Sequence, residues 1–240
     1  MAATTTTAFT LEPCSIQDGP ALAHNNIPAF WANVIWKRTW QHVTLGKQIV
    51  ETSKRIPRNL LNDRTVLRHQ KAVDNTNSTI LGYARWLLPE SVACVDGVFA
   101  WPEAMVPAVP AEEEAVIRAI AEGAEWNPDS SRDDVQFEEL MEKTKKRLRA
   151  AKAYLVLDYL AVHPKNQGKG IATSLVESGL AQARKLGLDV FVLAFPAGMG
   201  IYKRAGFRVV EQISTVYRID DADPLEYKIY FMEYEVGGSR

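Results

Sequence analysis

The feature that most constrains the fold is an apolar run from Tyr154 to Val162, followed at once by a polar segment that contains glycines. Asp158 is the only charged residue in the run. Such a run is typical of a central strand that is covered on both faces. Beyond the glycines, apolar residues recur at helical spacing up to Ala183, and Gly187 lies just past the end. We therefore expect a strand, a short loop and an amphipathic helix at the centre of an α/β fold.

The residues after this helix predict further sheet structure. Residues 189–195 form a second buried apolar run, which predicts a strand. A short helix is expected over about 197–204, closed by Gly206. Residues 207–211 and 226–235 supply two more strands.

The N-terminal part of the chain predicts one strand and two helices. An edge strand is expected at residues 6–13, and Gly19 with Pro20 is expected to break the chain. The dense apolar content of residues 21–41 predicts two helices, of which the first is limited by Pro28.

The middle of the chain predicts a hairpin, an insertion and a helix. Residues 65–73 and 80–88 look like paired strands joined by a polar turn. Residues of about 90–131 are acidic and punctuated by proline, so we expect an insertion within one domain that spans 1–240. A helix is expected over 137–149, with acidic residues early and basic residues late.

Composition excludes several classes of protein. The 240 residues are 47% hydrophobic and 24% charged, close to the average for a folded domain. A net charge of −1 disfavours nucleic acid and membrane surfaces as partners. Cys14 and Cys94 are the only cysteines, so neither a disulfide framework nor a metal site is expected. With no signal-peptide pattern and no membrane-spanning run, we expect a cytoplasmic protein, with the nucleus as a second compartment.

The segment from Gln167 to Ala172 carries the strongest functional signal. Its glycines let the backbone approach a ligand closely, and free N–H groups at the start of the following helix point at that ligand. This arrangement favours phosphate. The segment lacks the Gly-Lys-Ser/Thr ending of a Walker loop, and Thr173 stands where the dinucleotide motif has its third glycine.

In this context the segment resembles the GNAT superfamily of acetyl-CoA-dependent N-acetyltransferases. The family's Gln/Arg-x-x-Gly-x-Gly/Ala signature is matched by Gln167, Gly170 and Ala172, and the resemblance covers about 154–211. The long helix before the central strand resembles that of fungal-type members. The resemblance implies an α/β (α+β) GNAT fold, with a mixed, mostly antiparallel central sheet flanked by helices.

The resemblance also implies how acetyl-CoA would bind. Its pantetheine arm would run beside the end of the central strand, and the Val162 N–H would polarise the thioester carbonyl. The strand residues concerned are Leu160, Ala161 and Val162. The pyrophosphate would bind backbone N–H groups of the loop and the first helical turn. Those groups belong to Gln167, Gly168, Lys169, Gly170, Ile171, Ala172 and Thr173.

Three side chains are candidates for proton transfer. Tyr202 occupies the family's position for the general acid that protonates the thiolate, and a core role is its alternative interpretation. Asp158 lies where some relatives carry a general base, and an Asp held by hydrogen bonds to the neighbouring chain is an equally good interpretation. His163 is a second candidate base, although a histidine before a proline more often belongs to a loop.

We therefore expect acetyl transfer from acetyl-CoA to an amine, with a small molecule as the first choice, by direct attack. Two alternatives stay open. One is a non-catalytic acyl-CoA sensor or scaffold, and the other is an acyltransferase for another acyl chain or acceptor, including a hydroxyl group or a protein N-terminus. Trp31, Trp36, Trp40 and Tyr83 are interpreted as core, with a wall of the amine site as the alternative.

Overall fold

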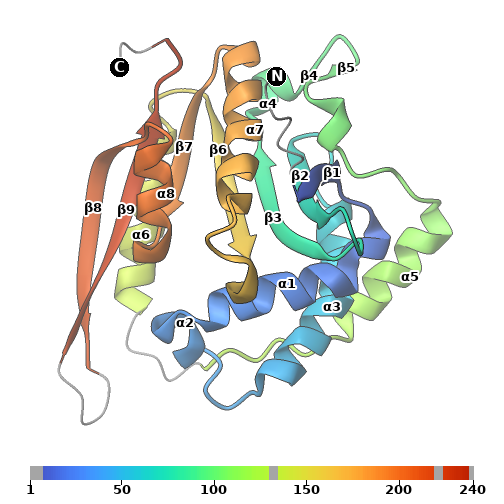
Figure 1. The fold of residues 1–240 in the computed structure, drawn as a ribbon, viewed down its shortest axis with the longest axis horizontal. Helices are drawn as coiled ribbons and strands as arrows, with labels where there is room; N and C mark the ends of the chain where they lie inside the picture. The colour runs from blue at the N-terminus through green and yellow to red at the C-terminus, as the bar shows by residue number, and fades with distance from the viewer. Residues whose placement is uncertain (1–7, 130–134, 219–223, 238–240) are drawn as a thin grey trace, which may run out of the picture.

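The structure is a computed structural model that describes residues 8–129, 135–218 and 224–237. Its strands are β1 (Phe9–Pro13), β2 (Leu67–Asp74), β3 (Ile80–Leu87), β4 (Cys94–Val95), β5 (Val98–Phe99), β6 (Tyr154–Val162), β7 (Asp189–Ala194), β8 (Arg208–Tyr217) and β9 (Leu225–Tyr234). Seven of them form one sheet in the order β1-β2-β3-β6-β7-β9-β8 (Figure 1). Among the described strands of this sheet, β6 and β7 are the only parallel pair. This mixed, mostly antiparallel sheet confirms the predicted fold class.

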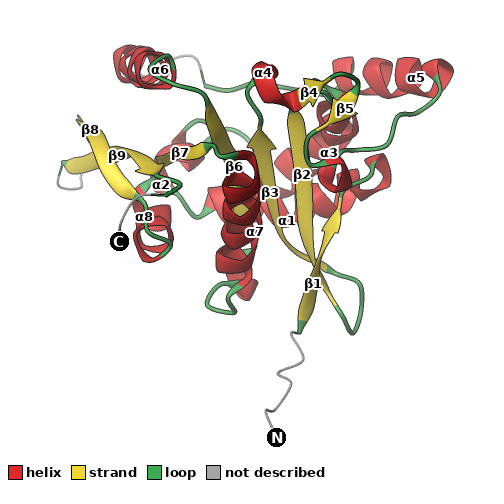
Figure 2. Ribbon diagram, turned by 90° about the horizontal axis from the view of Figure 1, so that it is seen from above, coloured by secondary structure: helices red, strands yellow, loops and turns green. Residues whose placement is uncertain are grey.

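Helices cover both faces of the sheet. They are α1 (Gly19–Trp31), α2 (Val34–Arg38), α3 (Leu45–Leu61), α4 (Glu90–Ala93), α5 (Ala111–Glu122), α6 (Val135–Arg149), α7 (Ile171–Leu186) and α8 (Pro196–Arg204). Figure 2 shows α7 and α8 on one side of the strands and α3 and α6 on the other. Helix α1 packs against α3, β3 and β6. The central strand β6 is therefore covered on both faces, as its apolar sequence predicts.

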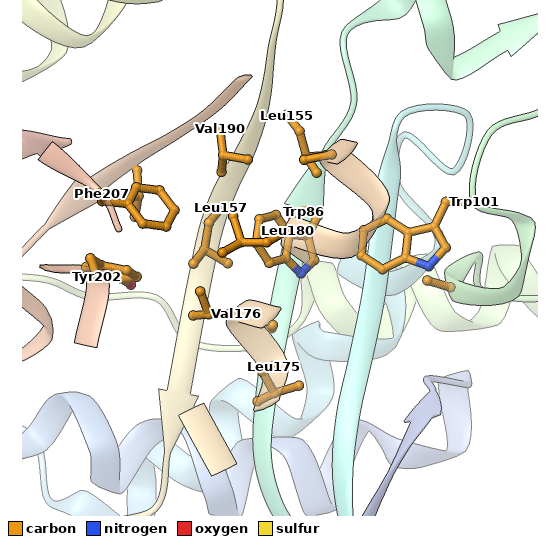
Figure 3. Close-up of a cluster of buried hydrophobic side chains, with 14 of the residues drawn as sticks. Trp86, Trp101, Leu155, Leu157, Leu175, Val176, Leu180, Val190, Tyr202 and Phe207 are labelled. Atoms are coloured by element: carbon orange, nitrogen blue, oxygen red, sulfur yellow. The ribbon is translucent and has the colours of Figure 1, made fainter. Parts of the chain in front are cut away.

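Two glycines bring α7 close to the sheet. A Cβ on Gly179 would lie 2.0 Å from Cζ2 of Trp86, and a Cβ on Gly82 would lie 2.6 Å from Cγ2 of Ile171. Both positions therefore need glycine to leave room for the facing side chain. Figure 3 shows the buried cluster to which these contacts belong, which includes Trp86, Leu157, Leu175, Val176 and Leu180. This packing fixes the start of α7 beside the end of β6.

The central strand loses one of its two neighbours halfway along. Its register with β7 runs from Tyr154 to Leu157, whereas its register with β3 continues to Val162. Asp158 is an extra residue in the register with β3, which makes it a β-bulge. Bulges increase the local twist of a strand and re-aim its side chains. From Asp158 onward, β6 has no ladder partner on the β7 side among the described strands.

Most predicted elements are confirmed. The central strand, the following helix, the second buried strand, the short helix and the last strand are β6, α7, β7, α8 and β9. The hairpin is β2 and β3, the helix over 137–149 is α6, and the edge strand is β1. Residues 6 and 7 of the predicted edge strand lie outside the described ranges. Strand β8 is longer than predicted, because it continues to Tyr217 alongside β9.

Two expectations for the N-terminal helices are wrong. Gly19 and Pro20 do not break the chain but begin α1, where a proline needs no N–H partner and already has a helical φ. Pro28 does not end α1, which continues to Trp31. The loss of one N–H donor at Pro28 is outweighed by the packing of α1 against α3 and the sheet.

Helix α3 is missing from the sequence prediction. Its sequence is strongly amphipathic, so its periodicity is a usable signal, and its buried face also includes the polar residues Gln48, Glu51 and Arg55.

The proposed insertion contains α4, β4, β5 and α5 within its described part, and α5 packs against α3. Residues 130 and 131 lie outside the described ranges, and the division of the chain at about 90–131 stays a prediction. Within the described parts of the chain, no helix combines the length and the apolar character needed to cross a bilayer.

Candidate functional site

The end of β6 is held by a buried amide from α1. Asn25 donates from Nδ2 to the carbonyl oxygen of Ala161 (3.2 Å), and its Oδ1 accepts the N–H of His163 (3.2 Å). Asn25 also donates to Oδ1 of Asn26 (2.9 Å). Backbone groups alternate between the two edges of a strand, so the Val162 N–H points away from Asn25. The strand residues expected to bind pantetheine thus lie on a strand end that α1 fixes.

The loop after β6 leaves N–H groups open at the start of α7. Gly168 and Gly170 have φ of +78° and +79°, in the left-handed region that favours glycine. No side chain caps the helix at Gly170, and a Cβ on either glycine would meet no atom within 4 Å. The N–H of Ser174 bonds to the Gly170 carbonyl oxygen at 3.0 Å. The first-turn donors without a helical partner are those of Ile171, Ala172 and Thr173.

The earlier part of the loop, residues 164–169, forms hydrogen bonds within itself. The Gln167 N–H donates to the carbonyl oxygen of Pro164 (3.4 Å), which closes the short 3-10 helix η3 (Pro164–Asn166). The Lys169 ammonium donates to Oδ1 of Asn166 (2.8 Å). The open donors for an anion therefore lie at the helix start rather than at Gln167.

His163 has a loop role. Its Nδ1 accepts the N–H of Lys165 (3.2 Å), so the side chain caps η3. Burial and then the charge of Lys165 lower the pKa of His163. These contacts favour the loop interpretation over that of a base.

At the bulge, Asp158 forms an ion pair with Arg85 of β3. Nε of Arg85 donates to Oδ2 of Asp158 at 2.8 Å, and Nη2 donates to the same oxygen. Burial lowers the pKa of Arg85, but the carboxylate of Asp158 and other neighbours raise it by more. The guanidinium therefore stays positively charged. Oδ1 of Asp158 has no hydrogen-bond partner among the described residues. The side chain of Asp158 is 39% exposed, so this oxygen is within reach of a ligand or water.

Tyr202 lies in the apolar core at one end of the cluster in Figure 3. Its side chain is buried, and its ring centroid is 5.6 Å from that of Phe207. The Tyr202 hydroxyl has no hydrogen-bond partner among the described residues, and burial raises the pKa of Tyr202 well above its ordinary value. Tyr202 and Val162 belong to the same buried cluster. A phenol in this position stays protonated, as a proton donor must.

A pocket of about 230 Å³ opens on the other face of the sheet, against α1, α3, β3 and β6. We call it the α1/α3 pocket. Its aromatic lining residues are Phe30, Trp36, Tyr83, Trp126 and Tyr159. Its charged lining residues are Arg55 and Arg85. Because Arg85 also binds Asp158, the pocket is connected to the bulge of β6.

The aromatic residues singled out in the sequence divide between pocket and core. Trp36 and Tyr83 line the pocket, Trp40 is buried, and Trp31 packs against Trp36 outside the lining. The Tyr83 hydroxyl lies 2.8 Å from Nδ1 of His69, a buried residue of β2. Burial lowers the pKa of His69 to about 3 and raises the pKa of Tyr83, so both side chains are neutral behind the pocket.

Comparison with known proteins identifies the unit around the loop. Residues 138–209, from α6 to the start of β8, match the acetyltransferase (GNAT) domain family. No curated protein matches the chain.

Solved structures share the fold at low identity. An acetyltransferase from Corynebacterium glutamicum related to the histone acetyltransferase HPA2 superposes with a TM-score of 0.52 at 14% identity, over 97% of this chain and 98% of the other. The apo form of an agmatine N-acetyltransferase variant gives 0.52 at 12% identity, over 95% and 99% of the two chains. The likeness to these structures shows the fold, and the family match covers the loop. The chain therefore contains a region, residues 138–209, that matches the GNAT acetyltransferase domain family, within a fold that it shares with solved acetyltransferases.

Proposed function

We propose that the protein transfers an acetyl group from acetyl-CoA to an amine, by direct attack in a complex that holds both substrates. The observation that carries the proposal is the position of open N–H groups beside a strand end with one free edge. The N–H groups at the start of α7 favour a diphosphate, and the free edge at Leu160 to Val162 favours an extended chain. Coenzyme A has a pyrophosphate joined to an extended amide-containing arm, so its chemistry matches both features.

The reaction requires one bond to form and one to break. The amine nitrogen bonds to the thioester carbonyl carbon, the carbon–sulfur bond breaks, the amine loses a proton and the thiolate gains one. The Val162 N–H is our candidate for stabilising the negative charge on the carbonyl oxygen, a role in which one donor contributes on the order of 3 kcal/mol.

Asp158 and Tyr202 are our candidates for the two proton transfers. Arg85 holds Asp158 by one oxygen, and the other oxygen is free to accept the amine proton, directly or through water. The Tyr202 hydroxyl is protonated and has no competing partner among the described residues, which suits a donor to the thiolate.

The amine would bind in the α1/α3 pocket. This assignment is supported by Arg85, which lines the pocket and holds Asp158 at the bulge. An amine bound there would reach the strand end from the face opposite α7.

A turnover assay tests the proposal. Purified protein is incubated with acetyl-CoA and a panel of small amines, and release of the coenzyme A thiol is followed with time. We expect thiol release that depends on the amine and saturates with both substrates. Thiol release at the same rate with and without every amine would contradict acetyl transfer. Propionyl-CoA and butyryl-CoA in the same assay test whether acetyl is the preferred acyl group.

A further inference from the structure

We propose that the amine substrate is an aromatic amine that also carries a carboxylate, of the aromatic amino acid class. The inference rests on the proposed acetyl transfer and adds the chemical class of the amine. It comes from three properties of the α1/α3 pocket: an aromatic wall, a buried arginine that forms no salt bridge among the described residues, and a buried amide nitrogen that has no hydrogen-bond partner among them.

The aromatic wall suits a planar ring. The ring centroids of Phe30 and Tyr159 lie 4.9 Å apart, and those of Tyr83 and Tyr159 lie 5.5 Å apart, both with edge-on geometry. Trp36 continues the wall at 5.9 Å from Phe30. Aromatic pairs at such spacings are favourable beyond the burial of area alone. A ring in the pocket would therefore gain contacts that a flexible aliphatic chain would not.

Arg55 is a buried cation on the pocket side of α3. Its side chain, from α3, is 7% exposed, and its guanidinium lies over the ring of Trp126 at 4.3 Å. It donates to Oγ1 of Thr52 (3.2 Å) and to the backbone carbonyl oxygen of Glu125. These partners are neutral, and within the described ranges Arg55 forms no salt bridge. Because a buried charge is costly without a partner, an anionic group on the ligand would stabilise this site.

Burial lowers the pKa of Arg55, the charge of Glu51 raises it by less, and the Glu51 carboxylate is engaged elsewhere. Glu51, one turn before Arg55 on α3, accepts the Lys54 ammonium (2.7 Å) and the N–H of Glu125 (2.8 Å). Two of the five N–H donors of Arg55 are used by described residues, so others are left for a ligand.

Gln48 supplies a second donor on the same face of α3. Gln48, Thr52 and Arg55 recur at helical spacing, and all three line the pocket. The Gln48 side chain is buried, and its Nε2 has no hydrogen-bond partner among the described residues. An unpaired buried amide costs free energy that a carboxylate oxygen, by accepting its N–H, would recover. Arg55 and Gln48 together therefore favour a carboxylate.

The charges that line the α1/α3 pocket also limit which amines it can bind. Among the described residues, no Asp or Glu lines the pocket, and the charge of Arg85 is balanced by Asp158 at the bulge. Because the amine of an amino acid is attached to the carbon that bears the carboxylate, a carboxylate bound at α3 keeps the amine inside the pocket that Arg85, the partner of Asp158, also lines. A polyamine would instead bring additional positive charge beside Arg55, which the pocket disfavours.

The test compares amines that differ by one carboxylate. L-tryptophan and L-phenylalanine are assayed with acetyl-CoA beside tryptamine, phenethylamine and spermidine. We expect kcat/KM for each amino acid to exceed that of its decarboxylated partner by about tenfold or more, the scale of one charged hydrogen bond, with spermidine the poorest. Equal or lower kcat/KM for the amino acids would overturn the proposal.

Arg55→Gln tests the residue that carries the inference. We expect KM for L-tryptophan to rise about tenfold or more, and KM for tryptamine to change by less than about threefold. Arg118→Gln is the control for the loss of one positive charge, because Arg118 lies on α5 outside the pocket lining, where it donates to Glu114 (2.6 Å). It should leave both KM values unchanged. An equal rise for both amines in Arg55→Gln would show that Arg55 only shapes the pocket, and would overturn its role in binding carboxylate.

Calorimetry with acetyl-CoA alone distinguishes a failure of the proposed substrate class from a failure of the proposed transferase function. If acetyl-CoA binds and spermidine or another amine without a carboxylate is the better substrate, the inference fails and the transferase function stands. If acetyl-CoA does not bind, or if no amine in the panel is acetylated, the proposed function fails, and the inference fails with it.

Discussion

Two nitrogens of the Arg85 guanidinium, Nε and Nη2, donate to the same oxygen of Asp158, Oδ2. The ion pair joins β3 to β6 at the bulge, where β6 parts from β7. The ion pair holds the Asp158 carboxylate by Oδ2 and leaves Oδ1 available to accept a proton. It also connects the strand end with the α1/α3 pocket, because Arg85 lines that pocket.

Asp158→Asn tests the proposed base. The amide oxygen can still accept from Arg85, so the fold and acetyl-CoA affinity should persist, while proton abstraction is lost. We expect turnover to fall by about 100-fold at pH values where the amine is largely protonated, and to recover partly as pH rises. A full pH–rate profile of variant and wild type checks this. Profiles of the same shape and height would assign Asp158 a purely structural role.

Tyr202→Phe tests the proposed acid. The substitution keeps the packing against Phe207 and removes a hydroxyl that has no hydrogen-bond partner among the described residues, so the melting temperature should barely change. Turnover should fall by about 100-fold, the scale of losing a positioned general acid, with acetyl-CoA affinity near that of wild type. Steady-state rates and a melting curve check the two halves. Full activity in the variant would place Tyr202 in the core alone.

Gly170→Glu tests the open helix start. It puts a side chain and a negative charge beside the N–H groups proposed for the pyrophosphate, in a backbone conformation that favours glycine. Gly187→Glu is the matched control, because Gly187 also has a positive φ, has open space around it and lies at the other end of α7. Calorimetry should show acetyl-CoA affinity reduced by about tenfold or more in the first variant and unchanged in the second. Equal affinity in both would remove the loop from the binding site.

The sequence predicts the centre of this fold well because local pattern and burial agree there. The run from Tyr154 to Val162 and the helix after the glycines are apolar where they are buried. Helix α3 is strongly amphipathic, so its periodicity is a usable signal; what that periodicity does not reveal is that Gln48 and Arg55 lie on its buried face. Contacts between residues that are distant in the sequence also cannot be predicted from the local pattern of apolar and polar residues.

The candidate site shows the same division. The glycine loop is readable from spacing, whereas the amide of Asn25 and the guanidinium of Arg85 reach β6 from distant segments. The sequence does contain a weak signal for each of these two residues. Asn25 is one of two adjacent asparagines in an apolar helix, and Arg85 is the only charged residue in β3. A polar residue in such a setting indicates a specific partner but does not say which one.

Gly179→Ala tests the close approach of α7 to the sheet. The new Cβ would lie 2.0 Å from the Trp86 ring, so the helix or the indole must move, at a cost of about 1–3 kcal/mol in the free energy of unfolding. Gly46→Ala is the control in α3, where a Cβ meets nothing within 4 Å. It should stabilise the protein by about 0.5–1 kcal/mol, since alanine favours a helix over glycine. Urea unfolding measures both. Stabilisation by Gly179→Ala would contradict the tight packing.

His69 gives the protein a predictable loss of stability in mild acid. Burial lowers its pKa in the folded state to about 3, whereas the unfolded chain binds a proton near pH 6.5. The unfolded state therefore binds more protons between these values, and stability falls as pH drops through 6.5 toward 3. Between pH 7.5 and 5 this term is about 2 kcal/mol. Unfolding free energies of wild type and His69→Gln at both pH values check it, and the same pH slope in both proteins would contradict it.

Acetyl transfer itself is tested by measuring both products after a single turnover. Protein in excess over acetyl-CoA is mixed with L-tryptophan, quenched at intervals, and analysed by mass spectrometry for free coenzyme A and for the N-acetylated amine. Acetyl transfer predicts that both appear together, in equal amounts, and that neither appears at this rate when the amine is omitted. Acetyl-CoA that is bound by the protein yet recovered intact, with no acetylated product from L-tryptophan or from any other amine of the panel, would contradict the account and identify a binding protein instead.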